Sequence, residues 1–268
     1  MESKARPKDY YNPRPKTASE AIGQLVLANR ILPNEGILDY LGHVSVRNPE
    51  NRETFFIAYS LAPEQVTARD IIEVDFEGNV LTPSPERPYA ERIIHGAIFK
   101  ARPDVNCVIH AHPQPIIILS ITDIPVRIIY HMASVFYEGV PLFDDYDMSP
   151  NASGMLIKTR EEGERVARSL GKARGMLMRG HGCNVVGESV PHAVQAVIAL
   201  RDNVSMQLAA QELGQFKGLS REEARVASEA LSGPKRGWNY WVARVKGEIP
   251  ALDDSALSHT GSGNHDRL

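Results

Sequence analysis

A short apolar segment that ends in two histidines constrains the fold of this chain more than any other feature. Residues 105–113 read Val-Asn-Cys-Val-Ile-His-Ala-His-Pro, and their β-branched side chains favour an extended strand. Successive side chains of a strand point to opposite faces, so His110 and His112 point the same way. Neutral imidazole is a common ligand of divalent transition metals. The segment therefore predicts a central strand with the beginning of a metal site at its end.

Two other segments offer partners for these histidines. Glu91 opens a predicted helix over residues 91–100, and residues 175–182 predict a short strand that ends in His181 between two glycines. A carboxylate and three histidines from three segments would leave coordination positions open, as a catalytic metal requires. Spacing alone equally allows these histidines to be ordinary side chains, so both interpretations stay open at this point.

The order of the expected elements indicates the fold class. Apolar periodicity and turn residues predict one helix, then several strands, then strands that alternate with helices. The expected helices cover 17–32, 91–100, 115–119, 160–170, 190–213 and 220–231, with a final ordered segment at 237–244. The expected strands cover 42–48, 54–59, 71–76, 105–113, 126–130, 139–143 and 175–178, and the apolar residues 184–187 follow the last of them. This order predicts a single α/β domain with three layers, α/β/α, around a mixed, largely antiparallel sheet.

The ends of the chain differ in composition from the rest. Residues 1–16 are polar and hold three prolines, which predicts an extended leader that wraps over a surface or a neighbouring subunit. Residues 251–268 are low in apolar content, which predicts a disordered tail. The catalytic domain is therefore expected to span 17–250.

Bulk composition excludes several classes of function. Thirty basic and thirty-three acidic side chains give a net charge of −3, so neither nucleic acid nor an anionic membrane is an expected partner. No apolar run approaches the roughly 20 residues that span a bilayer, and the amino terminus lacks the apolar segment of a secretory signal. Cys107 and Cys183 are the two cysteines, which predicts a reducing cytoplasm and no disulfide framework. Each is expected to be a small buried side chain, although either could be a thiolate ligand.

Four motifs together resemble the class II aldolase/adducin family and occur in its order. They are Gly-His-Val-Ser-Val-Arg at 42–47, Glu-Arg-Ile-Ile-His at 91–95, Arg-Pro-Asp-Val-Asn-Cys-Val-Ile-His-Ala-His at 102–112 and Arg-Gly-His-Gly at 179–182. The resemblance implies that His110, His112 and His181 bind a divalent metal, and that Glu91 lies at the metal as the acid/base. It also implies a homotetramer with active sites between adjacent subunits.

Three departures from the family's sugar-phosphate aldolases bear on the substrate. Those enzymes have Pro-Ser-Ser-Glu where this chain has Pro-Tyr-Ala-Glu at 88–91, a Thr-Pro-x-Gly loop where it has Ala-Tyr-Ser-Leu at 58–61, and Asn at the place of His43. A phosphate site needs backbone N–H groups and small donors, which these aromatic and imidazole side chains replace. A flat substrate without phosphate is therefore expected.

These departures resemble the decarboxylase branch of the family, which acts on hydroxylated aromatic carboxylates. The resemblance predicts a metal-dependent carboxy-lyase for a hydroxylated aromatic or pyridine dicarboxylate, with 3-hydroxy-2-methylpyridine-4,5-dicarboxylate of pyridoxine degradation as the specific candidate. Mn²⁺ is the expected metal, and Zn²⁺ and Fe²⁺ accept the same kind of ligand set.

Five side chains receive expected roles in such a reaction. Glu91 or His43 could transfer the proton; we favour Glu91, with His43 orienting a carboxylate. Arg47 could clamp a second carboxylate, because guanidinium binds carboxylates with two parallel hydrogen bonds, or it could be a surface strand arginine. Tyr59 and Tyr89 could stack on or hydrogen-bond the substrate ring, or simply pack.

Two other functions stay open. A retro-aldolase or epimerase that acts on a sugar-like substrate would use the same ligands. A non-catalytic binding module of the adducin kind would be expected to lose metal ligands, whereas this chain keeps three histidines and a glutamate in the motif positions.

Overall fold

A computed structural model describes residues 8–146, 154–231 and 233–247 of the 268-residue chain. The predicted tail at 251–268 and the first seven residues of the predicted leader lie outside these described residues. Within the described part, no helix is both long enough and apolar enough to cross a membrane.

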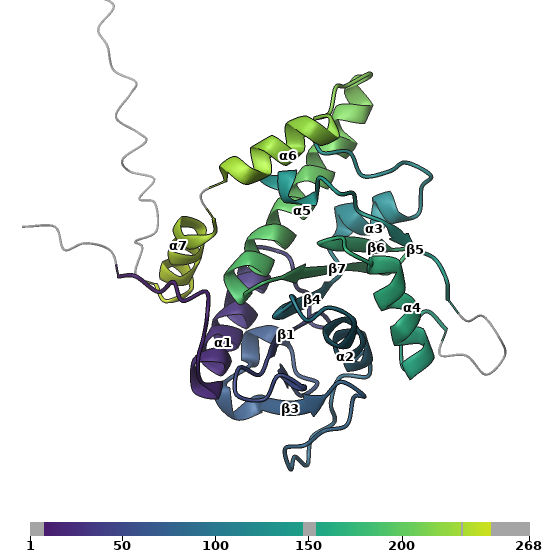
Figure 1. The fold of residues 1–268 in the computed structure, drawn as a ribbon. Helices are drawn as coiled ribbons and strands as arrows, with labels where there is room; N and C mark the ends of the chain where they lie inside the picture. Colours follow the sequence, from purple (N-terminus) through teal and green to yellow (C-terminus); the bar gives the residue numbers. More distant parts are fainter. Residues whose placement is uncertain (1–7, 147–153, 232, 248–268) are drawn as a thin grey trace, which may run out of the picture.

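A seven-stranded mixed sheet forms the centre of the domain (Figure 1). Its strands are β1 (His43–Arg47), β2 (Thr54–Ala58), β3 (Ile71–Asp75), β4 (Cys107–Ala111), β5 (Leu142–Phe143), β6 (Gly175–Met178) and β7 (Gly182–Gly187). They lie in the order β3-β2-β1-β4-β7-β6-β5, and every neighbouring pair is antiparallel except β5 with β6. The prediction of a single α/β domain with a mixed, largely antiparallel sheet is confirmed.

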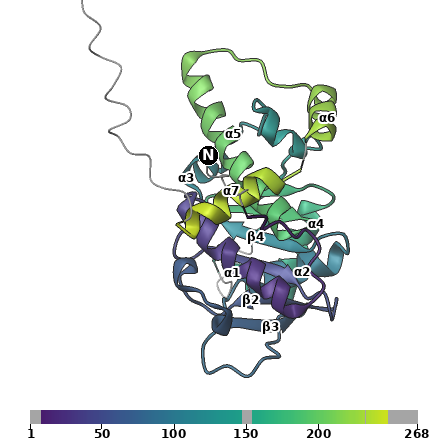
Figure 2. The ribbon, with the colours of Figure 1, turned by 90° about the vertical axis from the view of Figure 1, so that its left-hand side faces the viewer.

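Helices surround this sheet and connect its strands. They are α1 (Ala18–Asn34), α2 (Arg92–Ala101), α3 (Gln114–Ser120), α4 (Arg160–Leu170), α5 (Val190–Leu213), α6 (Arg221–Ala230) and α7 (Lys235–Val245), with the short 3₁₀ helices η1 (Pro63–Gln65), η2 (Ala68–Asp70) and η3 (His131–Phe136). Helices α1 and α5 pack against β1, β4 and β7, while α2 and α4 pack against each other on the opposite side (Figures 1 and 2).

Strands β1 and β4 are buried on both faces of the sheet. All five residues of each strand are buried, as expected for strands with helices on both sides. Ser45 of β1 reaches His95 of α2, whereas the alternate residues Val44 and Val46 point to the α1 face. His43 lies on the same face of β1 as Ser45, and His110 lies opposite His43 on β4. Both histidines therefore face the α2 side of the sheet.

The predicted strand at 126–130 is wrong, because this segment bonds to side chains of α5 instead of to a strand. The main-chain N–H groups of Ile129 and Tyr130 both donate to Asn203 Oδ1, at 2.9 and 3.1 Å. Arg127 N–H donates to Gln207 Oε1 at 2.8 Å. Buried amides from a helix thus supply the partners that a neighbouring strand would otherwise supply.

Asp9 and Tyr10, in the described part of the leader, contact α7. Tyr10 N–H donates to Asn239 Oδ1 at 2.8 Å, and Trp238 Nε1–H donates to Tyr10 O at 3.1 Å. Asp9 also forms an ion pair with Lys235 at 2.6 Å. These contacts attach the two ends of the described chain to each other.

Candidate active site

The structure brings the three predicted ligand histidines together at the end of the central strand. His110 and His112 come from the end of β4, and His181 comes from the turn between β6 and β7. Their ring centroids lie 4.8 Å (His110–His112), 4.9 Å (His110–His181) and 5.3 Å (His112–His181) apart. One nitrogen from each ring lies within 4.8 Å of the others, a spacing suited to one shared ion.

Hydrogen bonds fix which nitrogen of two of these rings faces the centre. His110 Nδ1 donates to Asn184 Oδ1 at 2.8 Å, and His112 Nδ1 donates to Asp39 Oδ1 at 3.0 Å, because both oxygens are acceptors. Each Nε2 therefore keeps its lone pair, and the two Nε2 atoms lie 3.0 Å apart. Two facing lone pairs repel unless a cation lies between them, so this donor set fits a divalent metal ion.

Glu91 lies beside the three histidines as the N-cap residue of α2. Its Oε2 is 3.6 Å from His110 Nε2 and 3.5 Å from His181 Nε2, and its Oε1 accepts from Ile157 N–H at 2.9 Å. Burial alone would raise the pKa of this carboxyl, but hydrogen bonding to His181 and charge on His110 and His181 outweigh it and lower the pKa to about 2. The carboxylate is therefore ionised beside the ion site.

His43 lies next to this group because β1 pairs with β4 in a register that puts His43 opposite His110. The two rings stack with centroids 5.0 Å apart. Burial, followed by nearby positive charge, lowers the pKa of His43 well below its usual value. The same causes lower the pKa values of His95 and His110 to about 3, so all three imidazoles are neutral near pH 7.

A pocket of about 460 Å³ opens in front of the histidines. Its lining combines imidazole and carboxylate groups with apolar side chains and, within the described part of the chain, includes no lysine or arginine. The lining residues are Asp39, Leu41, His43, Ser60, Tyr89, Ala90, Glu91, His112, Met155, Leu156, Gly180 and His181. Such a pocket suits a small ligand that is held by a metal and by neutral donors.

Tyr89 lines this pocket, as predicted, but Tyr59 does not. The Tyr89 ring lies 4.6 Å from the ring of His43, and its hydroxyl donates to the carbonyl oxygen of Leu61. Tyr89 therefore offers a ring face to a ligand, and its hydroxyl is already bonded. The Tyr59 hydroxyl donates to Asp70 at 3.0 Å, away from the pocket lining.

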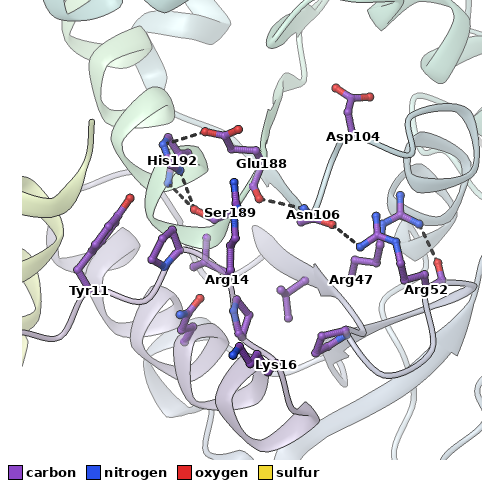
Figure 3. Close-up of a pocket in the computed structure, with 16 residues that line it drawn as sticks. Tyr11, Arg14, Lys16, Arg47, Arg52, Asp104, Asn106, Glu188, Ser189 and His192 are labelled. Atoms are coloured by element: carbon purple, nitrogen blue, oxygen red, sulfur yellow. Dashed lines mark hydrogen bonds and ion pairs between the residues drawn. The ribbon is translucent and has the colours of Figure 1, made fainter. Parts of the chain in front are cut away.

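Arg47 does not reach the histidines, which corrects the prediction of a carboxylate clamp. It lies four positions after His43 along β1, and it lines a different cavity of about 950 Å³ (Figure 3). Its guanidinium donates to four main-chain carbonyls at 2.7–3.0 Å, those of Arg52, Phe99, Arg102 and Val105. These bonds use the donors that a clamp would need, so Arg47 ties the end of β1 to α2 and its following loop.

The larger cavity in Figure 3 is not the chemical site, although it has the greater volume. It lies at the other end of β1 and β4, where Arg14, Lys16 and Asn106 are among its lining residues. Within the described residues, the groups with metal-binding spacing all belong to the histidine pocket. We therefore place the chemistry at the histidines.

Several residues that hold the ligands escaped the sequence reasoning. Asn184 lies opposite His110 in the β4–β7 register, and Asp39 anchors His112 from the loop before β1. Two-residue alternation could have identified Asn184 as the partner of His110, if the pairing of β4 with β7 had been known. The rings of Tyr146 and His181 stack with centroids 6.5 Å apart, and the buried hydroxyl of Tyr146 has no hydrogen-bond partner among the described residues.

Both cysteines are buried free thiols. Burial raises the pKa of Cys107 far above its usual value and that of Cys183 to about 12. Neither belongs to a group with metal-binding spacing in the described part of the chain, in agreement with the predicted role as small buried side chains.

A second group also has metal-binding spacing. One atom each from His43, Glu91 and His110 lie within 4.8 Å of one another. Because His110 belongs to both groups, distances alone do not decide which of the two groups would hold a single ion.

The protein belongs to the class II aldolase and adducin family. Residues 23–208 match the family described as "Class II Aldolase and Adducin N-terminal domain", a range that covers most of the domain and all of the candidate ligand residues. The family predicted from the sequence motifs is thereby confirmed.

Curated relatives include enzymes named as decarboxylases. The chain is 29% identical over 253 residues to "Decarboxylase tropJ" of Talaromyces stipitatus, covering 85% of this chain and 95% of that protein. It is 27% identical over 215 residues to "3,4-dihydroxyphthalate decarboxylase" of Arthrobacter keyseri, covering 75% and 82%. Among solved structures, an L-fuculose 1-phosphate aldolase from Glaciozyma antarctica superposes with a TM-score of 0.73 at 27% identity, covering 91% and 96% of the two chains.

The family and these relatives confirm the predicted enzyme class. The protein is an enzyme that breaks carbon–carbon bonds, a lyase of the carboxy-lyase kind. The non-catalytic alternative is thereby set aside.

Proposed function

We propose that this enzyme is a metal-dependent decarboxylase of a hydroxylated aromatic or pyridine dicarboxylate. The proposal rests on the Nε2 atoms of His110 and His112, which lie 3.0 Å apart with their lone pairs facing each other, and on the ionised Glu91 beside them. His110, His112 and His181 would hold the ion. A divalent cation there supplies a Lewis acid that draws electrons from the breaking bond onto a ring oxygen.

Glu91 moves the proton in this proposal. As an ionised carboxylate, it takes the proton of the substrate's ring hydroxyl when the substrate binds, because a cation held by the three histidines would make that hydroxyl more acidic. It then returns this proton to the ring carbon that bears the departing carboxylate. The bond between that carbon and the carboxylate breaks, CO₂ leaves, and the bonding electrons remain on the ring as the aromatic system is restored. Proton transfer by a positioned group of this kind contributes about 10²–10⁴-fold.

The pocket lining supports a flat substrate without a phosphate. Its described residues include no lysine or arginine to neutralise a phosphate, whereas the Tyr89 ring and the side chains of Leu41 and Leu156 offer apolar faces. Relatives named for 3,4-dihydroxyphthalate point to the same substrate class. Within this class, 3-hydroxy-2-methylpyridine-4,5-dicarboxylate of pyridoxine degradation is our specific candidate.

Mn²⁺ is the metal we propose, following the resemblance to the decarboxylase branch of the family; a set of three imidazoles also accepts Zn²⁺ or Fe²⁺. We also propose a cytoplasmic homotetramer with sites between subunits. Leu41 is 54% exposed and Leu156 is 39% exposed at the mouth of the pocket, and neighbouring Tyr40 is 73% exposed. Large apolar side chains at a pocket mouth are expected to be covered, and a neighbouring subunit would cover them.

A substrate panel with metal analysis tests the function. Purified protein is analysed for bound metal and then incubated with 3-hydroxy-2-methylpyridine-4,5-dicarboxylate, 3,4-dihydroxyphthalate and L-fuculose 1-phosphate. We expect CO₂ from at least one dicarboxylate, lost on chelation and restored by Mn²⁺. Carbonyl products from the sugar phosphate without CO₂ from either dicarboxylate would instead support the aldolase or epimerase alternative.

A further inference from the structure

A buried chain of three side chains ends at His43. Ser45 Oγ lies 2.5 Å from His95 Nδ1, and His95 Nε2 lies 2.7 Å from His43 Nδ1. Ser45 and His95 are fully buried, and His43 is 3% exposed. The chain crosses from β1 to α2 and back to β1, so it lies behind the pocket that His43 lines.

Counting hydrogens gives this chain a direction. Neutral His95 has one N–H, which lies either on Nε2 or on Nδ1. If it lies on Nε2, it donates to His43 Nδ1, and the Ser45 hydroxyl donates to His95 Nδ1, so that every hydrogen has an acceptor. If it lies on Nδ1, it donates to Ser45 Oγ, and the buried Ser45 hydroxyl has no other acceptor in the described part of the chain. A buried donor without an acceptor is unfavourable, so the first arrangement prevails.

We infer that Ser45 and His95 are positioning residues that fix His43 as a hydrogen-bond donor to the substrate. His43 Nδ1 accepts from His95, so the hydrogen of neutral His43 lies on Nε2. This nitrogen has no hydrogen-bond partner within the described residues, and its side chain lines the pocket. Nε2–H therefore awaits an acceptor on the ligand.

The direction of the chain also separates the two groups with metal-binding spacing. A ring nitrogen that carries hydrogen has no lone pair for a metal. His43 is therefore excluded as a ligand, and the ion belongs to His110, His112 and His181. Resting on the proposed function, the acceptor for His43 is a carboxylate oxygen of the substrate, the one not lost as CO₂. No proton is transferred; the hydrogen bond orients the substrate.

Neutron diffraction tests the hydrogen positions directly and does not depend on activity. Crystals of the full-length, metal-loaded protein exchanged into D₂O should show deuterium on His43 Nε2, on His95 Nε2 and on the Ser45 hydroxyl directed at His95 Nδ1. Deuterium on His43 Nδ1 with none on Nε2 would overturn the inference. If the protein releases no CO₂ from any dicarboxylate, the proposed function fails while the neutron map still decides this question.

A matched pair of variants tests what the chain does for binding. Ser45→Ala removes the first donor, and Ser134→Ala makes the same change at another fully buried serine, whose hydroxyl has no hydrogen-bond partner within the described part of the chain. With phthalate as a non-reacting dicarboxylate probe, Ser45→Ala is expected to weaken binding about tenfold, with metal content unchanged, because the His43 hydrogen is no longer held on Nε2. Ser134→Ala should bind as the wild type does.

Two outcomes would overturn the positioning role. One is Ser45→Ala binding phthalate within about twofold of the wild type. The other is an equal loss in both variants, which would indicate a general packing effect. With a substrate that turns over, Ser45→Ala should raise KM more than it lowers kcat, because the hydrogen bond binds the substrate and takes no part in proton transfer.

Discussion

Replacing Asn184 with leucine should weaken metal binding although Asn184 touches no ion. Asn184 is fully buried, and its Oδ1 is the acceptor for His110 Nδ1–H at 2.8 Å. Leucine has a similar volume and no acceptor. Asn184→Leu therefore leaves the His110 Nδ1–H buried without a partner, and it favours the tautomer whose hydrogen lies on Nε2, where the ion would bind.

The structure sets the size of this effect. An unpaired buried donor costs about 1–3 kcal/mol. Loss of a group that orients a metal ligand typically lowers metal affinity about 10–100-fold, which corresponds to about 1.4–2.8 kcal/mol. Water cannot easily replace the lost acceptor, because the side chains of His110 and Asn184 are both fully buried. We therefore expect the Mn²⁺ dissociation constant to rise about 10–100-fold.

Isothermal titration of metal-free protein with Mn²⁺ at fixed pH measures this change. Asn184→Asp is the matched control, because it keeps an acceptor oxygen at the same place and should retain binding. Thermal unfolding of the metal-free variants separates a local loss from general destabilisation. An Asn184→Leu protein that binds Mn²⁺ as tightly as the wild type would refute the tautomer reasoning for His110.

Four further predictions concern other parts of the molecule. Glu91→Gln should lower the rate of CO₂ release about 10²–10⁴-fold, as measured with saturating substrate, while bound metal persists. Arg47→Lys should lower the free energy of unfolding by about 2 kcal/mol, roughly 4–8 °C in Tm, because hydrogen bonds from the guanidinium to main-chain carbonyls are lost. An increased KM at unchanged Tm would instead support the role of Arg47 as a carboxylate clamp. Gly182→Ala should yield little folded protein in a solubility assay, because its Cβ would overlap the carbonyl oxygen of Ala111. Burial lowers the pKa of His95 from 6.5 to about 3, so between these values the unfolded chain binds more protons. The contribution of His95 to the free energy of unfolding of metal-free protein should therefore be complete above pH 6.5 and decrease as the pH falls toward 3. Denaturant titrations at about pH 7, 5.5 and 4 would show this decrease, and equal stability at all three values would contradict it.

Local pattern was sufficient for much of the fold and for the placement of His110 and His112 on one face of a strand. The helix predicted at 190–213 coincides with α5, and the one at 160–170 coincides with α4. Two-residue alternation put His110 and His112 on one face of β4, where the structure has them. These predictions succeeded because each depends on residues that are close together in sequence.

The failures depend on contacts between distant segments. The 126–130 segment has strand-like composition, but its hydrogen-bond partners are Asn203 and Gln207, which no local pattern reveals. Arg47 shares a face of β1 with His43, yet four residues along a strand amount to about 13 Å, so it lies at the other end. Only the fold showed which main-chain carbonyls the Arg47 guanidinium bonds.

Anomalous diffraction from a crystal grown with Mn²⁺ tests the central claim most directly. One anomalous peak per chain is expected among His110, His112 and His181, with each Nε2 at a bonding distance and with His43 outside the coordination sphere. A peak bound by His43, or no peak at these histidines in protein that releases CO₂, would contradict the account.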